Sequence, residues 1–105
     1  MRTVILLLAA AGVVATQSPR FESVQPELFA AGGTFVNAWA DYDNDGDPDL
    51  FVGFNGTPNR LYRNTKGAFA DAGVQAGLAE GRAVRAAAWG DFDGDGDSDL
   101  LVGFT

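Results

Sequence analysis

The sequence contains neither cysteine nor histidine. The absence of cysteine excludes disulfide bonds and thiol nucleophiles, and the absence of both residues excludes zinc sites built from them. Acid–base mechanisms that depend on histidine are excluded as well. A nucleophilic triad would therefore have to be built without its usual base.

Long apolar runs are also scarce. The longest covers residues 4–14, which is shorter than the ~18 residues that span a bilayer as a helix, so no transmembrane span is predicted. Arg2 precedes this run, and small or medium-sized residues up to Ala15 stand where a signal peptidase reads. We therefore predict a cleavable signal peptide at residues 1–15 and a secreted protein, extracellular or periplasmic. Residues 16–20 would begin the mature chain. An ordinary buried helix is the alternative, but no polar face supports it.

Basic residues are few. Seven Lys and Arg stand against fourteen Asp and Glu, and the net charge of −7 argues against nucleic acid as a partner. Ten of the fourteen acids fall within two nine-residue segments, 41–49 and 91–99, and the rest of the chain is mildly basic. The acidity therefore indicates cation sites rather than an acidic surface.

The two acidic segments belong to an internal repeat. Residues 38–54 and 88–104 share twelve identities in seventeen positions, at a spacing of 50 residues. A weaker match upstream of each segment predicts a first repeat at residues 21–68 and a second, truncated repeat at residues 69–105. A period of this length is typical of propellers and solenoids, whose units cannot bury their apolar faces alone.

Within a repeat the pattern predicts β structure. Short apolar or aromatic runs at residues 35–40 and 50–54 are bounded by turn-forming residues, and residues 60–63 alternate between polar and apolar. Residues 74–88 are rich in alanine, but two glycines interrupt them, so we predict a loop followed by a strand.

A tryptophan stands just before each acidic segment, Trp39 before the first and Trp89 before the second. In a β-sheet repeat such a residue is predicted to be an apolar plug in the core of the unit. A platform on which a ligand stacks is the alternative.

Each acidic segment has carboxylates at its first, third, fifth, seventh and ninth positions and a glycine at its sixth. Five negative charges in nine residues repel strongly unless a cation neutralises them. Alternate side chains converge on one ion in a calcium loop, where the glycine permits a sharp turn. So many carboxylates suit Ca²⁺ better than Mg²⁺ or a softer metal. We therefore predict two Ca²⁺ sites, with these metal-site residues: Asp41, Asp43, Asp45, Asp47, Asp49, Asp91, Asp93, Asp95, Asp97 and Asp99.

The aspartates at the seventh positions, Asp47 and Asp97, are predicted to contribute backbone carbonyls, with side chains that face solvent or reach the ion through water. The other four in each loop are predicted to supply side-chain oxygens. An EF-hand would need flanking helices and a bidentate Glu at the twelfth position, where Val52 and Val102 stand. Simple polar turns are the remaining alternative, but a turn needs one or two aspartates rather than five.

The order of motifs resembles a known family. The segment Asp-x-Asp-x-Asp-Gly-Asp-x-Asp-Leu is followed by Val-Gly, then by Arg-Leu-Tyr-Arg-Asn at residues 60–64, Gly-Ala-Phe at 67–69 and Ala-Gly-Leu at 76–78. This order is similar to that of FG-GAP/VCBS-type repeats, which form integrin-like β-propellers and occur in many secreted bacterial proteins. Because Gly-Ala-Pro is missing from both units, the VCBS-like branch is nearer.

The resemblance covers nearly all of residues 21–105 and implies an all-β fold of antiparallel β-propeller blades, with Ca²⁺ held in a hairpin loop. A full propeller of this type would have about seven blades. The chain would supply about one and a half to two blades of an incomplete propeller, so a fragment with its remaining blades missing is expected. Such a piece would fold poorly alone or associate through its open edges.

The expected function is adhesion or recognition of extracellular proteins or glycans by a secreted, calcium-binding, non-catalytic segment. The alternative is an accessory or scaffold part of a larger secreted enzyme that cleaves polysaccharides or phosphodiesters. The sequence offers no clear nucleophile or base for such chemistry, and carboxylates packed around a cation make poor proton donors. A purely structural stalk or filament built from open repeats is a third possibility.

Overall fold

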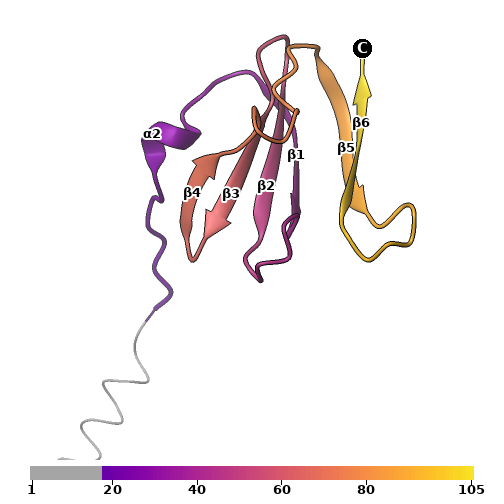
Figure 1. The fold of residues 1–105 in the computed structure, drawn as a ribbon. Coiled ribbons are helices and arrows are strands. Elements are labelled where there is room, and N and C mark those ends of the chain that lie inside the picture. Colours follow the sequence, from indigo (N-terminus) through magenta and orange to yellow (C-terminus); the bar gives the residue numbers. More distant parts are fainter. Residues whose placement is uncertain (1–17) are drawn as a thin grey trace, which may run out of the picture.

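Residues 18–105 are described in a computed structural model, and they form six strands and one short helix (Figure 1). The predicted signal peptide lies outside the described residues. Among residues 18–105, no helix has the length and apolar character needed to cross a bilayer. The elements in chain order are α2 (Pro26–Phe29), β1 (Thr34–Ala40), β2 (Asp49–Phe54), β3 (Arg60–Thr65), β4 (Ala68–Asp71), β5 (Val84–Gly90) and β6 (Asp99–Phe104).

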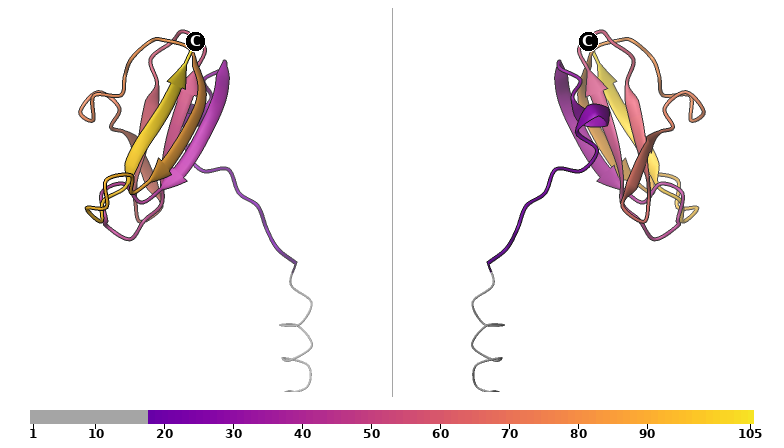
Figure 2. Two further views of the ribbon diagram at one scale, coloured as in Figure 1. Left: turned by 90° about the vertical axis from the view of Figure 1, so that its right-hand side faces the viewer. Right: turned by 90° about the vertical axis from the view of Figure 1, so that its left-hand side faces the viewer.

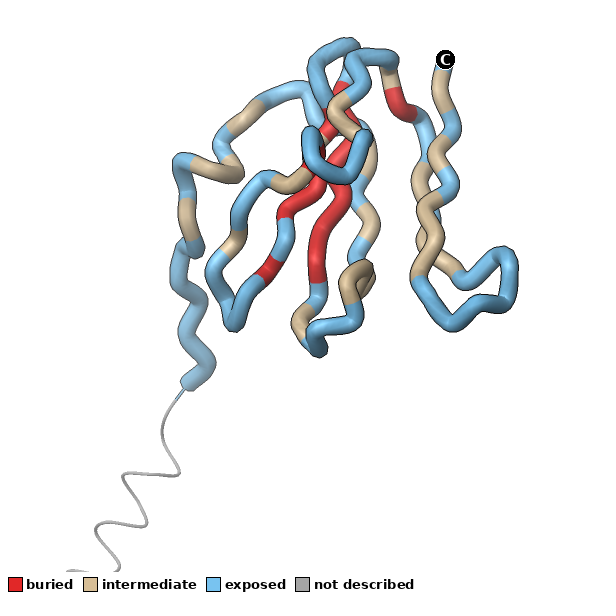
Figure 3. The backbone as a smooth tube through the Cα atoms, viewed as in Figure 1, coloured by how far each residue is buried: buried red, intermediate tan, exposed pale blue. Residues whose placement is uncertain are grey.

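The first four strands make one sheet in the order β1-β2-β3-β4, and every neighbouring pair is antiparallel. All six residues of β2 are buried, and buried positions continue along β3 (Figure 3). This four-stranded meander confirms the prediction of an all-β chain built from antiparallel blades. Strand β4 crosses the predicted boundary between the repeats at residues 68 and 69, and that boundary stays a prediction.

The second sheet of the described chain is the hairpin of β5 and β6. Its strands pair in the same register as β1 and β2 of the first hairpin. Ala40 lies opposite Asp49 in the first hairpin, and Gly90 lies opposite Asp99 in the second. Both hairpins also carry a register shift near the start of their first strand. The spacing of 50 residues found in the sequence is therefore a structural period.

The second hairpin packs face to face on the first sheet, with β5 against β1 and β2 (Figure 2). The core between the two sheets contains the fully buried side chains of Phe51, Leu61 and Val84. Trp89 packs against this cluster, and its indole Nε1 donates a hydrogen bond of 3.0 Å to the carbonyl oxygen of Ala38 in β1. This arrangement confirms that Trp89 is an apolar plug between two sheets.

The opposite face of the first sheet is covered by the segment around α2. Phe29 packs against the cluster that contains Tyr62, with ring centroids 4.7 Å apart. The side chain of Gln25 holds the segment to β4, since it accepts a hydrogen bond of 2.6 Å from the N–H of Phe69 and donates one of 2.9 Å to the carbonyl oxygen of the same residue. Neither α2 nor β4 was predicted from the sequence.

Trp39 does not fill the core as predicted. Its residue is 55% exposed, and its ring meets Phe69 edge-on at a centroid distance of 6.3 Å. The reason is that Trp39 points to the face of the first sheet that no second sheet covers in residues 18–105, whereas Trp89 points to the covered face of its own hairpin. The predicted strand after the alanine-rich loop is confirmed as β5, which begins at Val84.

Candidate metal centre

Two hairpin loops carry the predicted metal-site aspartates, and both lie at the lower end of the sheets in Figure 1. The first loop, residues 41–49, leads from β1 into β2, and the second loop, residues 91–99, leads from β5 into β6. The flanking elements are strands rather than helices. They exclude an EF-hand, in agreement with the sequence analysis.

The first loop curls around the carboxylate of Asp41. One oxygen, Oδ1, accepts a hydrogen bond from the N–H of Asp45 at 3.1 Å, and Oδ2 accepts one from Gly46 at 2.8 Å. Gly46 has a φ of 91°, a left-handed conformation that favours glycine. The predicted sharp turn at the sixth position is therefore present.

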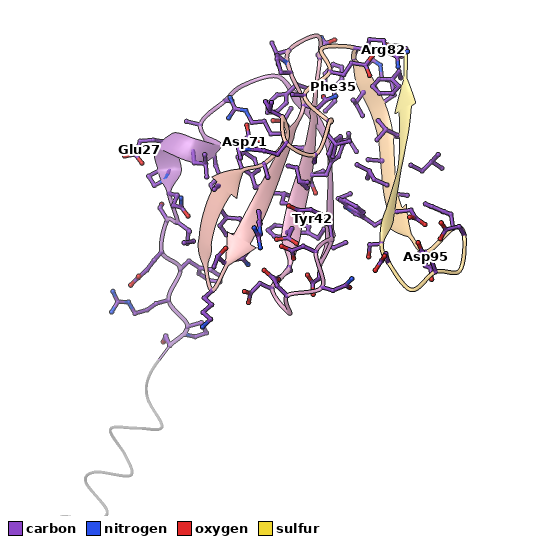
Figure 4. The ribbon with its side chains drawn as sticks, in the orientation of Figure 1. Glu27, Phe35, Tyr42, Asp71, Arg82 and Asp95 are labelled. Carbon is purple, nitrogen blue, oxygen red and sulfur yellow. The ribbon has the colours of Figure 1, made fainter. Side chains whose placement is uncertain are left out.

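The second loop repeats this geometry around Asp91. Its Oδ1 accepts hydrogen bonds from Gly94 at 2.8 Å and Asp95 at 3.0 Å, and its Oδ2 accepts one from Gly96 at 2.8 Å. Gly96 also has a φ of 91°. Figure 4 shows Asp95 in this loop. Because both loops use their first aspartate in the same way, they are two copies of one structure.

Each loop gathers four carboxylates into a group that can hold a metal ion. One oxygen atom from each of the four lies within 4.8 Å of the others. The two groups have the same positions of the repeat: Asp41, Asp43, Asp45 and Asp49, and Asp91, Asp93, Asp95 and Asp99. These are the eight residues predicted to supply side-chain oxygens.

The seventh-position aspartates stand outside these groups, and their side chains bond elsewhere. Asp47 Oδ2 accepts a hydrogen bond of 3.0 Å from the N–H of Lys66, in the turn between β3 and β4. Asp97 Oδ1 accepts one of 3.0 Å from the side-chain amide of Asn44, in the other loop. Ligation through their backbone carbonyls stays a prediction.

Asp49 anchors the first loop to the sheet. It is fully buried, and its two oxygens accept hydrogen bonds from the N–H groups of Asn64 at 2.7 Å and Tyr42 at 3.0 Å. In the second loop, Asp99 Oδ2 accepts the equivalent bond from Phe92 at 2.9 Å. The ninth-position carboxylate therefore closes the loop and also faces the acidic group.

Asp43 has an enclosed carboxylate that accepts no hydrogen bond within residues 18–105 at either of its two oxygens. Arg63 Nε lies 2.6 Å from Oδ2 and forms an ion pair without hydrogen-bond alignment. Burial raises the pKa of Asp43, and the charges of Asp49 and Asp45 raise it further, against the opposing effect of Arg63. Arg63 brings one positive charge to a group of four carboxylates, so a further cation would stabilise the enclosed carboxylate.

The first and third positions of each loop have opposite electrostatic character. The pKa of Asp91 is lowered, mainly by the N–H of Gly96. The pKa of Asp93 is raised, because desolvation and the nearby carboxylates of Asp95 and Asp99 outweigh the hydrogen bond from the N–H of Asp95. The second loop thus contains one carboxylate whose pKa the backbone lowers and one whose pKa rises despite a backbone hydrogen bond. A donor set made entirely of carboxylates fits a hard metal ion.

Comparison with protein families identifies the repeat. The model described as "FG-GAP-like repeat" matches residues 41–102, a range that starts at the first aspartate of the first loop and ends in β6. The chain belongs to the FG-GAP-like repeat family. Neither the curated proteins nor the solved structures that were searched gave a match. The family assignment confirms the resemblance found in the sequence, and it covers both acidic loops of this FG-GAP-like chain.

Several residues that support the loops of this FG-GAP-like repeat were not predicted to do so. Arg63 pairs with Asp43, Asn64 donates to Asp49, and Lys66 donates to Asp47, all from β3 or the turn that follows it. The family motif includes Arg63 and Asn64 but gives no sign of what they contact. Their positions opposite the loop depend on the pairing of β2 with β3. That pairing brings together residues that are 15 (Asn64–Asp49) and 19 (Lys66–Asp47) positions apart.

Proposed function

We propose that this chain is a calcium-stabilised part of a secreted β-propeller that recognises proteins or glycans and performs no catalysis itself. The observation that carries the proposal is the enclosed carboxylate of Asp43, which has no hydrogen-bond donor and lies within a group of four convergent carboxylates. Membership of the FG-GAP-like repeat family supports a repeat domain with a structural or recognition role.

Calcium is favoured over other ions by the chemistry of the loops. All the converging ligands are carboxylate oxygens, and Ca²⁺ accepts six to eight oxygen ligands in flexible geometry, whereas Mg²⁺ demands a near-ideal octahedron. A chain without cysteine has no disulfide bonds to hold its hairpins. Bound calcium would take over that function, and affinities of about 10⁻⁴ to 10⁻³ M suffice for an extracellular module.

A non-catalytic role follows from the state of the same carboxylates. A glycosidase needs one carboxylic acid that can donate a proton, but carboxylates that surround a divalent cation stay ionised. The loops would therefore stabilise the ends of the blades, and the exposed surfaces of the sheets and turns would contact the ligand.

Isothermal titration calorimetry tests the calcium sites. We expect two Ca²⁺ ions per chain in the wild type and one in either Asp43→Asn or Asp93→Asn, with Mg²⁺ a weak competitor. Glu27→Gln is the matched control, because it removes an exposed acid outside the loops and should leave both sites intact. The absence of saturable binding in the wild type would refute the proposal.

Secretion is tested separately by expressing the complete chain in a bacterial host with an export pathway. We expect the protein to leave the cytoplasm and its mature form to begin at Thr16, as determined by mass spectrometry. Arg2→Glu should slow export, because the positive charge before the apolar run is reversed. Retention of the uncleaved chain in the cytoplasm would contradict the export proposal and leave the calcium sites unaffected.

Recognition is tested by binding the purified chain to panels of immobilised glycans and extracellular proteins. We expect binding that requires calcium and is reduced in the Asp43→Asn/Asp93→Asn double variant. The Glu27→Gln variant should bind as the wild type does. Binding that is equally strong in EDTA would contradict a role for the loops, and no binding to either panel would contradict recognition of these ligands.

A further inference from the structure

The two acidic loops touch each other across the boundary between the sheets. The side-chain amide of Asn44 in the first loop donates a hydrogen bond of 3.0 Å to Oδ1 of Asp97 in the second. The fourth position has left-handed backbone in both loops, with a φ of 58° at Asn44 and 76° at Gly94. Asparagine tolerates this conformation, so the first loop keeps the backbone of the second and gains a side chain that reaches its neighbour.

A second contact joins the starts of the loops. The ring of Tyr42, which is labelled in Figure 4, stacks on that of Trp89 at a centroid distance of 6.4 Å and an interplanar angle of 26°. The N–H of Tyr42 is bonded to Asp49, while the indole of Trp89 is bonded to the carbonyl oxygen of Ala38. We call these three contacts, Asn44–Asp97, Tyr42–Trp89 and Trp89–Ala38, the inter-loop clasp.

The clasp connects groups that an ion would order. On one side it reaches Asp49 of the first carboxylate group through the backbone of Tyr42. On the other it reaches Trp89, two residues before Asp91 of the second group. Because the clasp ties the two loops together, an ion that orders one loop also orders contacts that the other loop shares, so the second ion has less left to order. This gain opposes the direct repulsion between the two cations, which by itself would weaken the second site.

We propose that the clasp couples the two loops, so that calcium in either one raises the affinity of the other, and that Asn44 is the positioning residue for this coupling. The inference rests on the proposed calcium function. Coupling between binding sites is reciprocal, so the factor by which the first ion strengthens the second equals the factor in the opposite direction.

The coupling is measured by disabling one loop and titrating the other with calcium by calorimetry. Asp43→Asn weakens the first loop without removing any clasp residue, and we expect the Kd of the second loop to rise about fivefold, at the lower end of typical coupling factors. In an Asn44→Gly background the same change should leave that Kd unaltered. Asn55→Gly, an exposed asparagine in the turn between β2 and β3, is the matched control and should preserve the fivefold effect.

Two further measurements separate coupling from simple stability. In a Trp39→Phe chain, Trp89 is the remaining tryptophan, and its fluorescence should change when calcium fills the first loop of an Asp93→Asn variant. Asn44→Gly should weaken this fluorescence change. Because glycine suits the left-handed backbone at this position, circular dichroism should still show an intact fold. Asn44→Asp should make the two loops repel each other, because it places a second carboxylate next to that of Asp97.

The outcomes distinguish this inference from the proposed function. Two calcium sites whose affinities are independent would overturn the coupling and leave the calcium function standing. An equal loss of affinity with and without Asn44 would show that another contact carries the coupling and would overturn the role assigned to Asn44. No calcium binding in the wild type would overturn both.

Discussion

Gly53 in β2 allows the two sheets to approach each other, and replacing it tests the interface between them. A Cβ atom at this position would lie 2.7 Å from both Cβ and Cγ1 of Val84 and 2.8 Å from Cγ1 of Val36. Carbon atoms prefer separations of about 3.5–4.0 Å, so Gly53→Ala forces the second hairpin away from the first sheet. The repeat provides a matched control at Gly103, where the nearest atom, Cβ of Ala86, would be 3.6 Å away.

The expected loss of stability in Gly53→Ala depends on how tightly the interface between the two sheets is packed. Val84 is fully buried in the core between the sheets, so it has no free space into which it can move. Inserting a methyl group into a packed core typically costs about 1–3 kcal/mol, and we expect Gly53→Ala to fall in the upper half of that range. Gly103→Ala makes the same chemical change in a strand at an equivalent position, so differences in strand propensity cancel.

Urea unfolding in saturating calcium measures the difference. We expect Gly53→Ala to lower the unfolding midpoint clearly and Gly103→Ala to leave it close to that of the wild type. The fluorescence of Trp89 provides a local probe, because its indole lies between the sheets and should become more exposed in Gly53→Ala alone. Equal midpoints for the two variants would refute the packing of the hairpin on the sheet.

Four further predictions follow from the contacts of the loops and the core. Asp49→Ala should destabilise the chain by about 3 kcal/mol in EDTA, because one buried and one half-buried N–H group lose their acceptor. Asp99→Ala should destabilise it by less, as compared by urea unfolding. Adding EDTA should lower the thermal midpoint, since calcium at 100-fold its Kd contributes about 2.7 kcal/mol per site; an unchanged midpoint in calorimetry would argue against ion binding. Trp89→Phe should cost about 1 kcal/mol through its lost hydrogen bond, and the exposed Trp39→Phe should be neutral in the same assay. Gln25→Ala should speed amide exchange in β4 measured by NMR, and protection equal to the wild type would contradict the role of this side chain.

The strands and loops could be predicted from the sequence because they depend on local patterns. Alternation, turn residues and the period of 50 residues predicted β1, β2, β3, β5 and both acidic hairpins. The helix α2 has only four residues, so its stability comes from tertiary contacts rather than from helix propensity. Those contacts join Gln25 to Phe69, 44 residues away, and nothing in the sequence of either segment indicates the other.

The two tryptophans show that burial in the core could not be predicted from local sequence either. Trp39 and Trp89 follow an alanine at equivalent positions of equivalent strands, yet one is largely exposed and the other lies between two sheets. Local sequence decides on which face of a strand a side chain lies, but the neighbouring sheet decides whether that face is covered. An identical motif therefore predicts orientation and does not predict burial.

For the candidate site, the sequence predicted the acidic positions and the turn glycines but none of the contacts between separate elements. The spacing of alternate aspartates is a local property, so the convergence of four carboxylates could be foreseen. The pairing of Arg63 with Asp43 depends on strand register, and that of Asn44 with Asp97 depends on the docking of two repeats. Their common feature is that both partners lie far apart in sequence.

The identical register of the two hairpins also creates a problem for folding. Strand β6 presents β1 with almost the same residues as β2 does, so a chain that pairs β1 with β6 would satisfy a similar ladder. Exchange of equivalent strands between repeats or between molecules is a common error of repeat proteins. What separates right from wrong pairing is distance along the chain, since closing a short loop costs less entropy than closing a long one. By keeping β1 next to β2 and β5 next to β6, the short acidic loops help each strand to find its own partner.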